Sequence, residues 1–269
     1  MREFMIFLQK RMETPKQFGT LHLVAIALLV VINFCECFFF RNSSERKYRG
    51  ILVIIWVLMF VTEVLAEIVL SLTITEGEVF VWKYRCSFIP LQLCDAPLYL
   101  LLPIAFLKDG KLRDALSSYM CSYVLVGGLS VFIFSSTILG SNVFLNFRTL
   151  LHHGLQVAVG IFIGVRNRKR LSLRTFLSTG LVFLFAVACV TLFNVVGHAL
   201  FPDEYINMFY ISPYYRRTVP FWNDAWQSMH PVEVILFYIV VMSALAFAFY
   251  FVYRLFVRLF SPSSKEEKG

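Results

Sequence analysis

The chain has 269 residues, of which 58% are hydrophobic and only 16% are charged, with a formal net charge of +8 at pH 7. About a quarter of an ordinary soluble domain is charged, so this composition excludes a soluble protein and indicates one integral membrane domain. The positive charge does not indicate a nucleic-acid partner, because the basic residues lie in short clusters between apolar runs, as they do in cytoplasmic loops.

Seven apolar runs follow one another along the chain. About 20 such residues cross a bilayer as a helix. The predicted spans are 19–40, 50–72, 88–107, 115–139, 146–165, 175–200 and 231–258. We therefore predict an all-α fold, a polytopic bundle of seven transmembrane helices. The cysteines and histidines lack the spacing of a zinc site, so we predict no metal and no cofactor.

The basic residues predict an orientation in a cell membrane. Nine of the 25 lysines and arginines fall on the side of the N-terminus, and the other sixteen fall on the opposite side. Because positive charge accumulates in cytoplasmic loops, we predict the N-terminus outside and the C-terminus inside.

Polar residues of the predicted spans gather at the outer ends. This group comprises His22, Glu63, Glu67, Gln92, Cys94, Asp95, His152, His153, Asn194 and His198. An ionisable group within a span costs roughly 2.5–3.5 kcal/mol to insert, so it normally faces the bundle interior and finds a partner. Glu63 and Glu67 share one helix face and repel each other unless a cation or a shared proton intervenes. We therefore expect a polar cavity that opens to the outer leaflet.

The segment IPLQLCDAPLYLLLP, residues 89–103, places Cys94 beside Asp95 in an apolar span that prolines interrupt. A cysteine thiolate is a strong nucleophile once a base has removed its proton. The candidate bases are His153 and His152, the candidate orienting carboxylates are Asp95, Glu67 and Glu63, and the candidate oxyanion donors are Asn194, His198 and Gln92. The plainer interpretation is that Cys94 fills apolar space and that the histidines sit wet at helix ends.

The longest linker, 201–230, is rich in Tyr, Phe and Trp and contains Arg216 and Arg217. Aromatic residues of this kind sit at headgroup depth, which predicts an extracytoplasmic aromatic loop. The arginine pair could hold a phosphate through paired hydrogen bonds, and the loop would then be a lid over a lipid-facing cavity. Otherwise the loop only anchors the bundle.

Four motifs in order resemble the YwaF-type integral membrane proteins, whose relatives include a mammalian seven-span acyltransferase acting on lyso ether phospholipids. They are FGTLHL at 18–23, IPLQLCD at 89–95, FRTLLHHGL at 147–155 and INMFYISP at 206–213. The resemblance implies acyl transfer, with Cys94 as the nucleophile and His153 as the base. Its implied partners are membrane phospholipids and lysophospholipids. The chain departs from the family pattern at Gln92, where members often carry His, and at Met208 after Asn207, where they often carry Tyr.

Two other classes of function remain open. A transporter would bind a cation or proton at Glu63, Glu67 and Asp95 on a permeation path. The apolar inner halves of the spans argue against such a path, because transporters keep polar groups near the midplane. A sensor or partner-binding protein would tolerate replacement of Cys94 by Ala or Ser.

Overall fold

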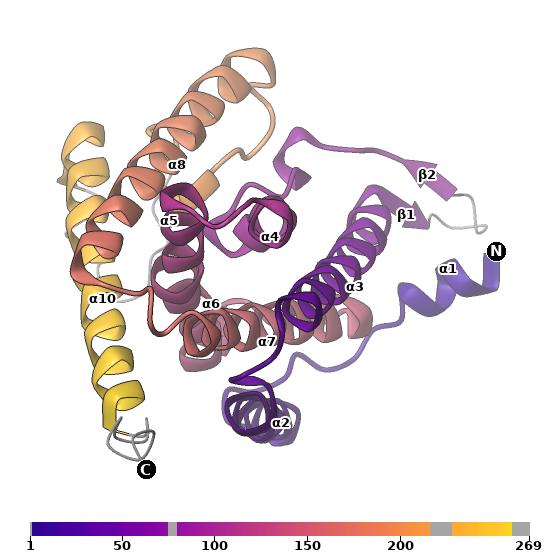
Figure 1. The fold of residues 1–269 in the computed structure, drawn as a ribbon. Coiled ribbons are helices and arrows are strands. Elements are labelled where there is room, and N and C mark those ends of the chain that lie inside the picture. The colour runs from indigo at the N-terminus through magenta and orange to yellow at the C-terminus, as the bar shows by residue number, and fades with distance from the viewer. Residues whose placement is uncertain (1, 75–79, 216–227, 260–269) are drawn as a thin grey trace, which may run out of the picture.

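The computed structural model describes residues 2–74, 80–215 and 228–259, and this part of the chain is mostly helical (Figure 1). The longer helices are α1 (Arg2–Leu8), α2 (Thr20–Cys35), α3 (Glu45–Ser71), α4 (Ala96–Phe106), α5 (Lys111–Tyr119), α6 (Leu125–Ile133), α7 (Val143–Arg166), α8 (Leu173–Leu200) and α10 (Pro231–Leu259). Short 3₁₀ or π turns are η1 (Glu36–Phe40), η2 (Cys86–Phe88), η3 (Leu93–Asp95), η4 (Met120–Val124), η5 (Ser135–Thr137) and η6 (Met208–Tyr210). Strands β1 (Leu72–Ile74) and β2 (Phe80–Trp82) form an antiparallel pair.

Five helical stretches in the described residues are long and apolar enough to cross a membrane. They are Thr20–Phe40, Glu45–Ser71, Lys111–Ile133, Leu173–Leu200 and Pro231–Leu255. Their outward surfaces are apolar, as a lipid-facing surface must be. The chain is therefore a membrane protein with several apolar helices.

The other two predicted spans differ from the expectation in instructive ways. Residues 88–107 do not form one bent helix, because only the 11 residues of α4 are helical and they follow an irregular segment. At 1.5 Å per residue, α4 reaches roughly 16 Å, about half of a bilayer core. Helix α7 has 24 residues and matches the predicted span 146–165, but its polar side chains keep it out of the five most apolar stretches.

Helix α7 lies at the centre of the bundle, packed against α2, α3 and α6, while α5 packs on α8 and α4 on α3 (Figure 1). Two glycines allow the close approach of α7 and the α5–α6 stretch. A Cβ at Gly160 would lie 3.0 Å from the Met120 carbonyl oxygen, and one at Gly128 would lie 2.9 Å from Val157. Between α5 and α6 the chain takes one π turn, η4, where the Gln156 side chain donates to the Val124 carbonyl oxygen at 2.5 Å.

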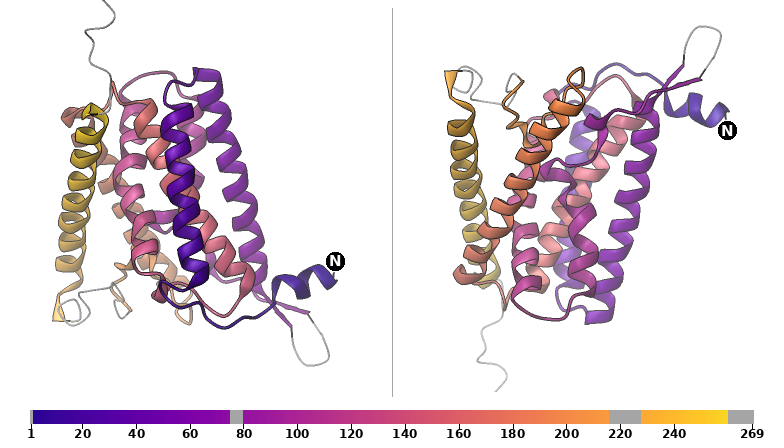
Figure 2. Two further views of the ribbon diagram at one scale, coloured as in Figure 1. Left: turned by 90° about the horizontal axis from the view of Figure 1, so that it is seen from below. Right: turned by 90° about the horizontal axis from the view of Figure 1, so that it is seen from above.

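The bundle has two chemically different ends. Helix α1 lies at one end, held where the Gln9 amide donates to the carbonyl oxygens of Val69 and Leu72 at 2.8 Å. The α2–α3 turn lies at the opposite end (Figure 2). Hydrogen bonds from Arg166 and Arg168 to the backbone of that turn bring the α7–α8 connection to the same end. We call this the basic end, since residues 41–49, 108–113 and 166–174 supply most of its charge.

Candidate functional site

The irregular segment before α4 holds Cys94 and Asp95 inside the bundle. The Gln92 backbone N–H donates to Asp95 Oδ2 at 2.7 Å, so the aspartate closes the turn that begins at Gln92. Trp56 on α3 donates from its indole nitrogen to the Leu98 carbonyl oxygen at 2.7 Å and fixes the first turn of α4. Pro97 stands at the start of that helix, where its missing N–H costs nothing.

Cys94 is half-buried and is joined to two neighbours by hydrogen bonds. Its thiol donates to Asp95 Oδ1 over 3.7 Å. Its backbone carbonyl oxygen lies 3.0 Å from His152 Nε2, which donates because a carbonyl can only accept. The thiol therefore has an adjacent carboxylate that can accept its proton, and an imidazole is bound to the same residue.

Helix α7 brings Arg148 and His152 to this segment, four residues apart on one helix face. Arg148 Nη2 forms an ion pair with Glu63 Oε2 on α3 and lies 3.9 Å from Asp95 Oδ1. His152 bridges the two acids, with Nδ1 3.6 Å from Glu63 Oε2 and Nε2 3.6 Å from Asp95 Oδ1. We call Glu63, Asp95, Arg148 and His152 the buried polar cluster.

The charges of this cluster leave room for one proton. Two carboxylates face a single permanent cation, Arg148, so one further proton on a carboxyl group or on the His152 ring would balance the cluster. His152 is fully buried, and its Nδ1 atom has no hydrogen-bond partner among the residues that the structure describes. The arrangement can therefore accept and return a proton next to the Cys94 thiol.

The cluster also has the donor types of a metal site. One ligand atom each from Glu63, Asp95 and His152 lies within 4.8 Å of the other two. Arg148 already supplies positive charge to the Glu63 oxygen, so a bound cation would have to displace or tolerate that guanidinium.

Arg148 is not among the candidate residues of the sequence analysis, because an arginine near the end of a predicted span resembles the other basic residues of the connecting loops. The structure places it in the second turn of α7, with a side chain that is 17% exposed. It is the cation that Glu63 needs. The available signal was its spacing of four residues from His152, which puts both side chains on the same helix face.

Two other predicted residues lie beside the cluster without joining its contacts. The His153 ring stands 5.6 Å from that of His152, and its Nδ1 donates to the Thr149 carbonyl oxygen at 2.7 Å. That bond leaves Nε2 of a neutral His153 as a proton acceptor. Glu67, one turn along α3, interacts with the Tyr84 side chain and more weakly with Arg148.

Gln92, Asn194 and Asn207 share a different task, which is to hold the segment around η6. Gln92 accepts from the Phe209 N–H at 2.8 Å and donates to the Asn207 carbonyl oxygen at 3.1 Å. Asn194 on α8 binds both backbone groups of Met208, donating at 3.0 Å and accepting at 2.7 Å. We call this set of bonds the amide clamp. The Gln92 and Asn194 side chains are engaged with the η6 backbone, and a role of either one as an oxyanion donor stays a prediction.

The remaining predicted residues do not meet the cluster. His22 accepts from the Phe18 N–H at 3.0 Å and packs on Phe132. His198 stacks on Tyr214 at 3.9 Å between ring centroids and binds Tyr215. Arg216 and Arg217, with residues 218–227 of the predicted aromatic loop, lie outside the described residues.

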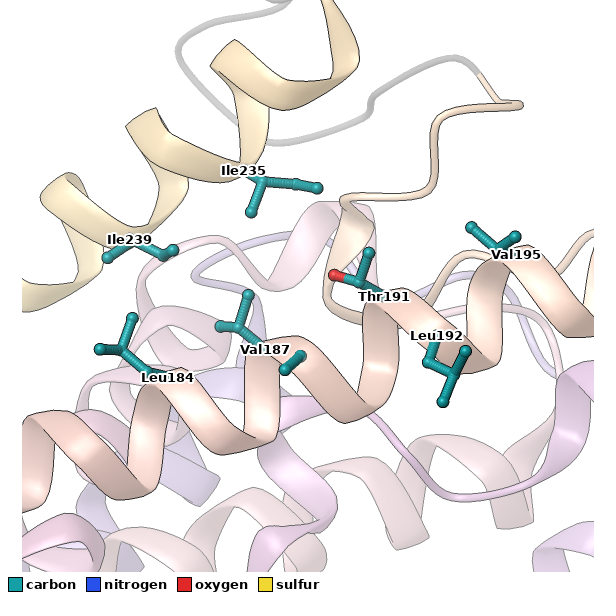
Figure 3. Close-up of a pocket in the computed structure, with 8 residues that line it drawn as sticks. Leu184, Val187, Thr191, Leu192, Val195, Ile235 and Ile239 are labelled. Atoms are coloured by element: carbon teal, nitrogen blue, oxygen red, sulfur yellow. The ribbon is translucent and has the colours of Figure 1, made fainter.

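An apolar groove runs between α8 and α10 (Figure 3). Its volume is about 560 Å³, and its lining is Leu184, Val187, Ala188, Thr191, Leu192, Val195, Ile235 and Ile239. Asn194 lies between Thr191 and Val195 in sequence, so the groove borders the stretch of α8 that holds the amide clamp. The clamp ends at Gln92, two residues before Cys94.

The fold and this site define a helical membrane protein with a thiol, two carboxylates, an arginine and an imidazole gathered inside its bundle. The model of the TMEM164 family matches residues 17–254, and the chain belongs to that family. No curated protein matches the chain, and no solved structure matches it.

Proposed function

We propose that the chain is a membrane-embedded lipid acyltransferase with Cys94 as its nucleophile. The observation that carries this proposal is the contact of the Cys94 thiol with Asp95 Oδ1, made on a residue whose carbonyl binds His152. A thiol with a proton acceptor at hand, inside a bundle that faces lipid, suits attack on an acyl ester. The resemblance to the YwaF-type proteins and their acyltransferase relative supports the same chemistry.

The reaction has two half-steps. In the first, the Cys94 sulfur attacks the ester carbonyl carbon of a phospholipid, and the thiol proton passes to the buried polar cluster. The ester C–O bond breaks, the cluster returns the proton to the leaving alkoxide, and the lysophospholipid departs as an alcohol. The enzyme then carries the acyl chain as a thioester. In the second, the hydroxyl of another lysophospholipid gives up its proton to the cluster and attacks the thioester, and the thiol is restored.

The arrangement of groups favours a different proton route from the predicted His153 base. Asp95 is the group in contact with the thiol through Oδ1, and His152 Nε2 lies 3.6 Å from the same Oδ1 atom. We infer that Asp95 takes the proton and becomes neutral, and that Arg148 and His152 stabilise its carboxylate before the transfer. His153, with Nε2 free to accept, is the second candidate and would act on the acceptor hydroxyl.

The groove between α8 and α10 fits the acyl chain of the donor lipid. Its walls are aliphatic apart from Thr191, and it borders the helix segment that the amide clamp connects to Gln92. An acyl chain that enters such a groove from the bilayer exchanges one apolar environment for another, so van der Waals packing rather than the hydrophobic effect would hold it.

The basic end supports an orientation with the N-terminus outside and the C-terminus in the cytoplasm of a cell membrane. Sixteen basic residues lie on that side in the predicted seven-span topology, against nine on the other. The buried polar cluster would then open to the outer leaflet. The cation-transporter alternative has less support, because Arg148 already neutralises Glu63.

Mass spectrometry of the protein after incubation with phosphatidylcholine and a lysophospholipid tests the proposal. Wild type should carry an acyl group on Cys94 and consume the lysophospholipid, while Cys94→Ala should do neither. Cys121→Ala is the matched control, since Cys121 is a buried cysteine of η4 whose thiol donates to the Ser118 carbonyl oxygen three residues earlier. Equal activity in Cys94→Ala and wild type would overturn the proposal.

The two histidines can be separated by the same assay. Loss of a general acid–base group typically slows a reaction about 10²–10⁴-fold. We expect Asp95→Asn and His152→Gln to slow formation of the thioester, and His153→Gln to slow only its transfer to the acceptor. A His153→Gln variant that cannot form the thioester would show that His153, rather than Asp95, takes the proton of the Cys94 thiol.

A further inference from the structure

A second cavity lies at the basic end, far from Cys94 along the bundle. It occupies about 350 Å³ between the α2–α3 turn and the α7–α8 connection. Its lining is Arg41, Asn42, Ser43, Arg166, Asn167, Arg168, Lys169 and Arg170. Five of these eight residues are cationic, and the rest are polar.

Hydrogen bonds hold the walls of this cavity in place. Arg166 Nε donates to the Ser43 carbonyl oxygen at 2.7 Å. Arg168 donates to the Arg41 carbonyl oxygen at 3.1 Å and to Asn42 Oδ1 at 3.0 Å. The two connections are therefore tied across more than 120 residues of sequence, and the cations are positioned before any ligand arrives.

The positive charge of the cavity is only partly balanced. Arg170 is paired with Asp109, and Arg166 lies 3.8 Å from Glu45. Within residues 2–74, 80–215 and 228–259, no carboxylate pairs with Arg41, Arg168 or Lys169, which leaves three uncompensated cations. Clustered cations repel one another and favour an anion between them.

One lining hydroxyl points to the same kind of ligand. Ser43 Oγ is buried and has no hydrogen-bond partner in the described part of the chain, although the Ser43 backbone carbonyl oxygen is bound by Arg166. A buried hydroxyl without a partner costs free energy that a ligand oxygen could recover.

We propose that this cavity binds a phosphate ester. Guanidinium groups match phosphate oxygens through paired, charge-assisted hydrogen bonds, and the Ser43 hydroxyl adds a neutral donor. The phosphate belongs to an anionic lipid headgroup at this end of the bundle or to a water-soluble phosphate ester, since the two share the same chemistry. Basic pockets between transmembrane helices take such headgroups. The proposal does not depend on the acyltransferase assignment.

Binding of a fluorescent short-chain phosphatidic acid to the full chain in a phosphate-free, uncharged detergent tests this site. The test variant is Arg41→Gln with Lys169→Gln, because both residues are exposed and neither pairs with a carboxylate among the described residues. The control is Arg46→Gln with Lys47→Gln, which removes the same charge from the first turn of α3, outside the cavity. We expect the test variant to bind about tenfold or more weakly and the control to change less than about twofold.

Ser43→Ala gives a second, milder readout, in which the dissociation constant should rise a few-fold without a change in thermal midpoint. Competition identifies the source of the phosphate. Unlabelled phosphatidic acid should displace the probe, and displacement by glycerol 3-phosphate as well would assign a soluble ester rather than a lipid. Displacement by dioctanoylglycerol, equal weakening in both double variants, or no saturable binding would overturn the proposal.

Discussion

The same ion-pair chemistry serves two different purposes at the two ends of this molecule. Inside the bundle, Arg148 meets Glu63 and Asp95, whose side chains are 9% and 5% exposed. At the basic end, Arg170 meets Asp109, with side chains that are 40% and 55% exposed. A buried charge depends on its partner because no water can replace it, whereas an exposed charge is solvated whether or not the pair forms.

This difference in burial shows which kind of ligand each of the two regions can bind. The buried polar cluster has two carboxylates but only one permanent cation. It needs one further proton to balance its charge, and it can exchange that proton. The basic end has too many cations for its own acids, so it is poised to hold an anion from outside. Each imbalance points to a different kind of ligand.

Removal of the buried cation, Arg148, should have the largest effect on stability. Arg148→Met would leave Glu63 buried without a partner, and we expect it to lower the free energy of unfolding by about 3–5 kcal/mol. Thermal and denaturant unfolding in detergent would measure the loss. Adding Glu63→Gln should restore most of it, because the uncompensated carboxylate is then gone. A loss no larger than that of a surface pair would mean that water reaches the cluster.

A neutral polar contact in the interior should have an intermediate effect. Asn194→Ala removes two hydrogen bonds to the Met208 backbone and leaves both groups buried, which we expect to cost about 1–3 kcal/mol. Hydrogen exchange of residues 205–212 should accelerate. Asn33→Ala, whose side chain binds only its own helix, should leave that exchange unchanged. If both variants behaved alike, the clamp would not hold this segment.

The smallest effect belongs to the exposed pair. The Arg170 and Arg113 guanidinium groups lower the pKa of Asp109 to about 2 from its ordinary 3.8. The stabilisation is therefore complete above pH 3.8 and is lost as the pH falls through about 2. Asp109→Asn should cost less than about 1 kcal/mol at neutral pH. The difference in thermal midpoint from wild type should shrink between pH 4 and pH 2 and in high salt, and a difference that grew instead would contradict this origin.

Sequence alone located the long apolar helices well. Helices α8 and α10 begin within two residues of the predicted spans, because the length of an apolar run is a local property of the chain. The third predicted span, 88–107, is α-helical only in α4, because contacts from distant parts of the chain fix the conformation of its first residues. The irregular segment before α4 is held by distant groups, Trp56 on α3 and the η6 backbone that Gln92 binds, and nothing within residues 88–107 reveals them.

The candidate site shows the same limit. Cys94, Asp95, Glu63 and His152 could be named because each is an unusual residue in an apolar stretch. The arrangement of these side chains could not be predicted. Arg148 forms an ion pair with Glu63, 85 positions away in sequence, and no local pattern of residues indicates such a long-range contact. Whether Cys94 and His153 act in catalysis stays a prediction that the acyl-transfer assay must test.

The π turn η4 has a consequence for how this chain tolerates insertions and deletions. Such a turn accommodates one residue more than an α-helix needs, and here Gln156 binds the carbonyl group of Val124 within it. Deleting one residue from 120–124 would let the helix continue as a regular α-helix, and because the π turn absorbs its extra residue, Gly127 and Gly128 would still face α7. The same deletion in the middle of α7, which is a regular α-helix over Val143–Arg166, would rotate one half of that helix against the other by about 100°. A one-codon deletion at the π turn should therefore be tolerated better than one in the middle of α7.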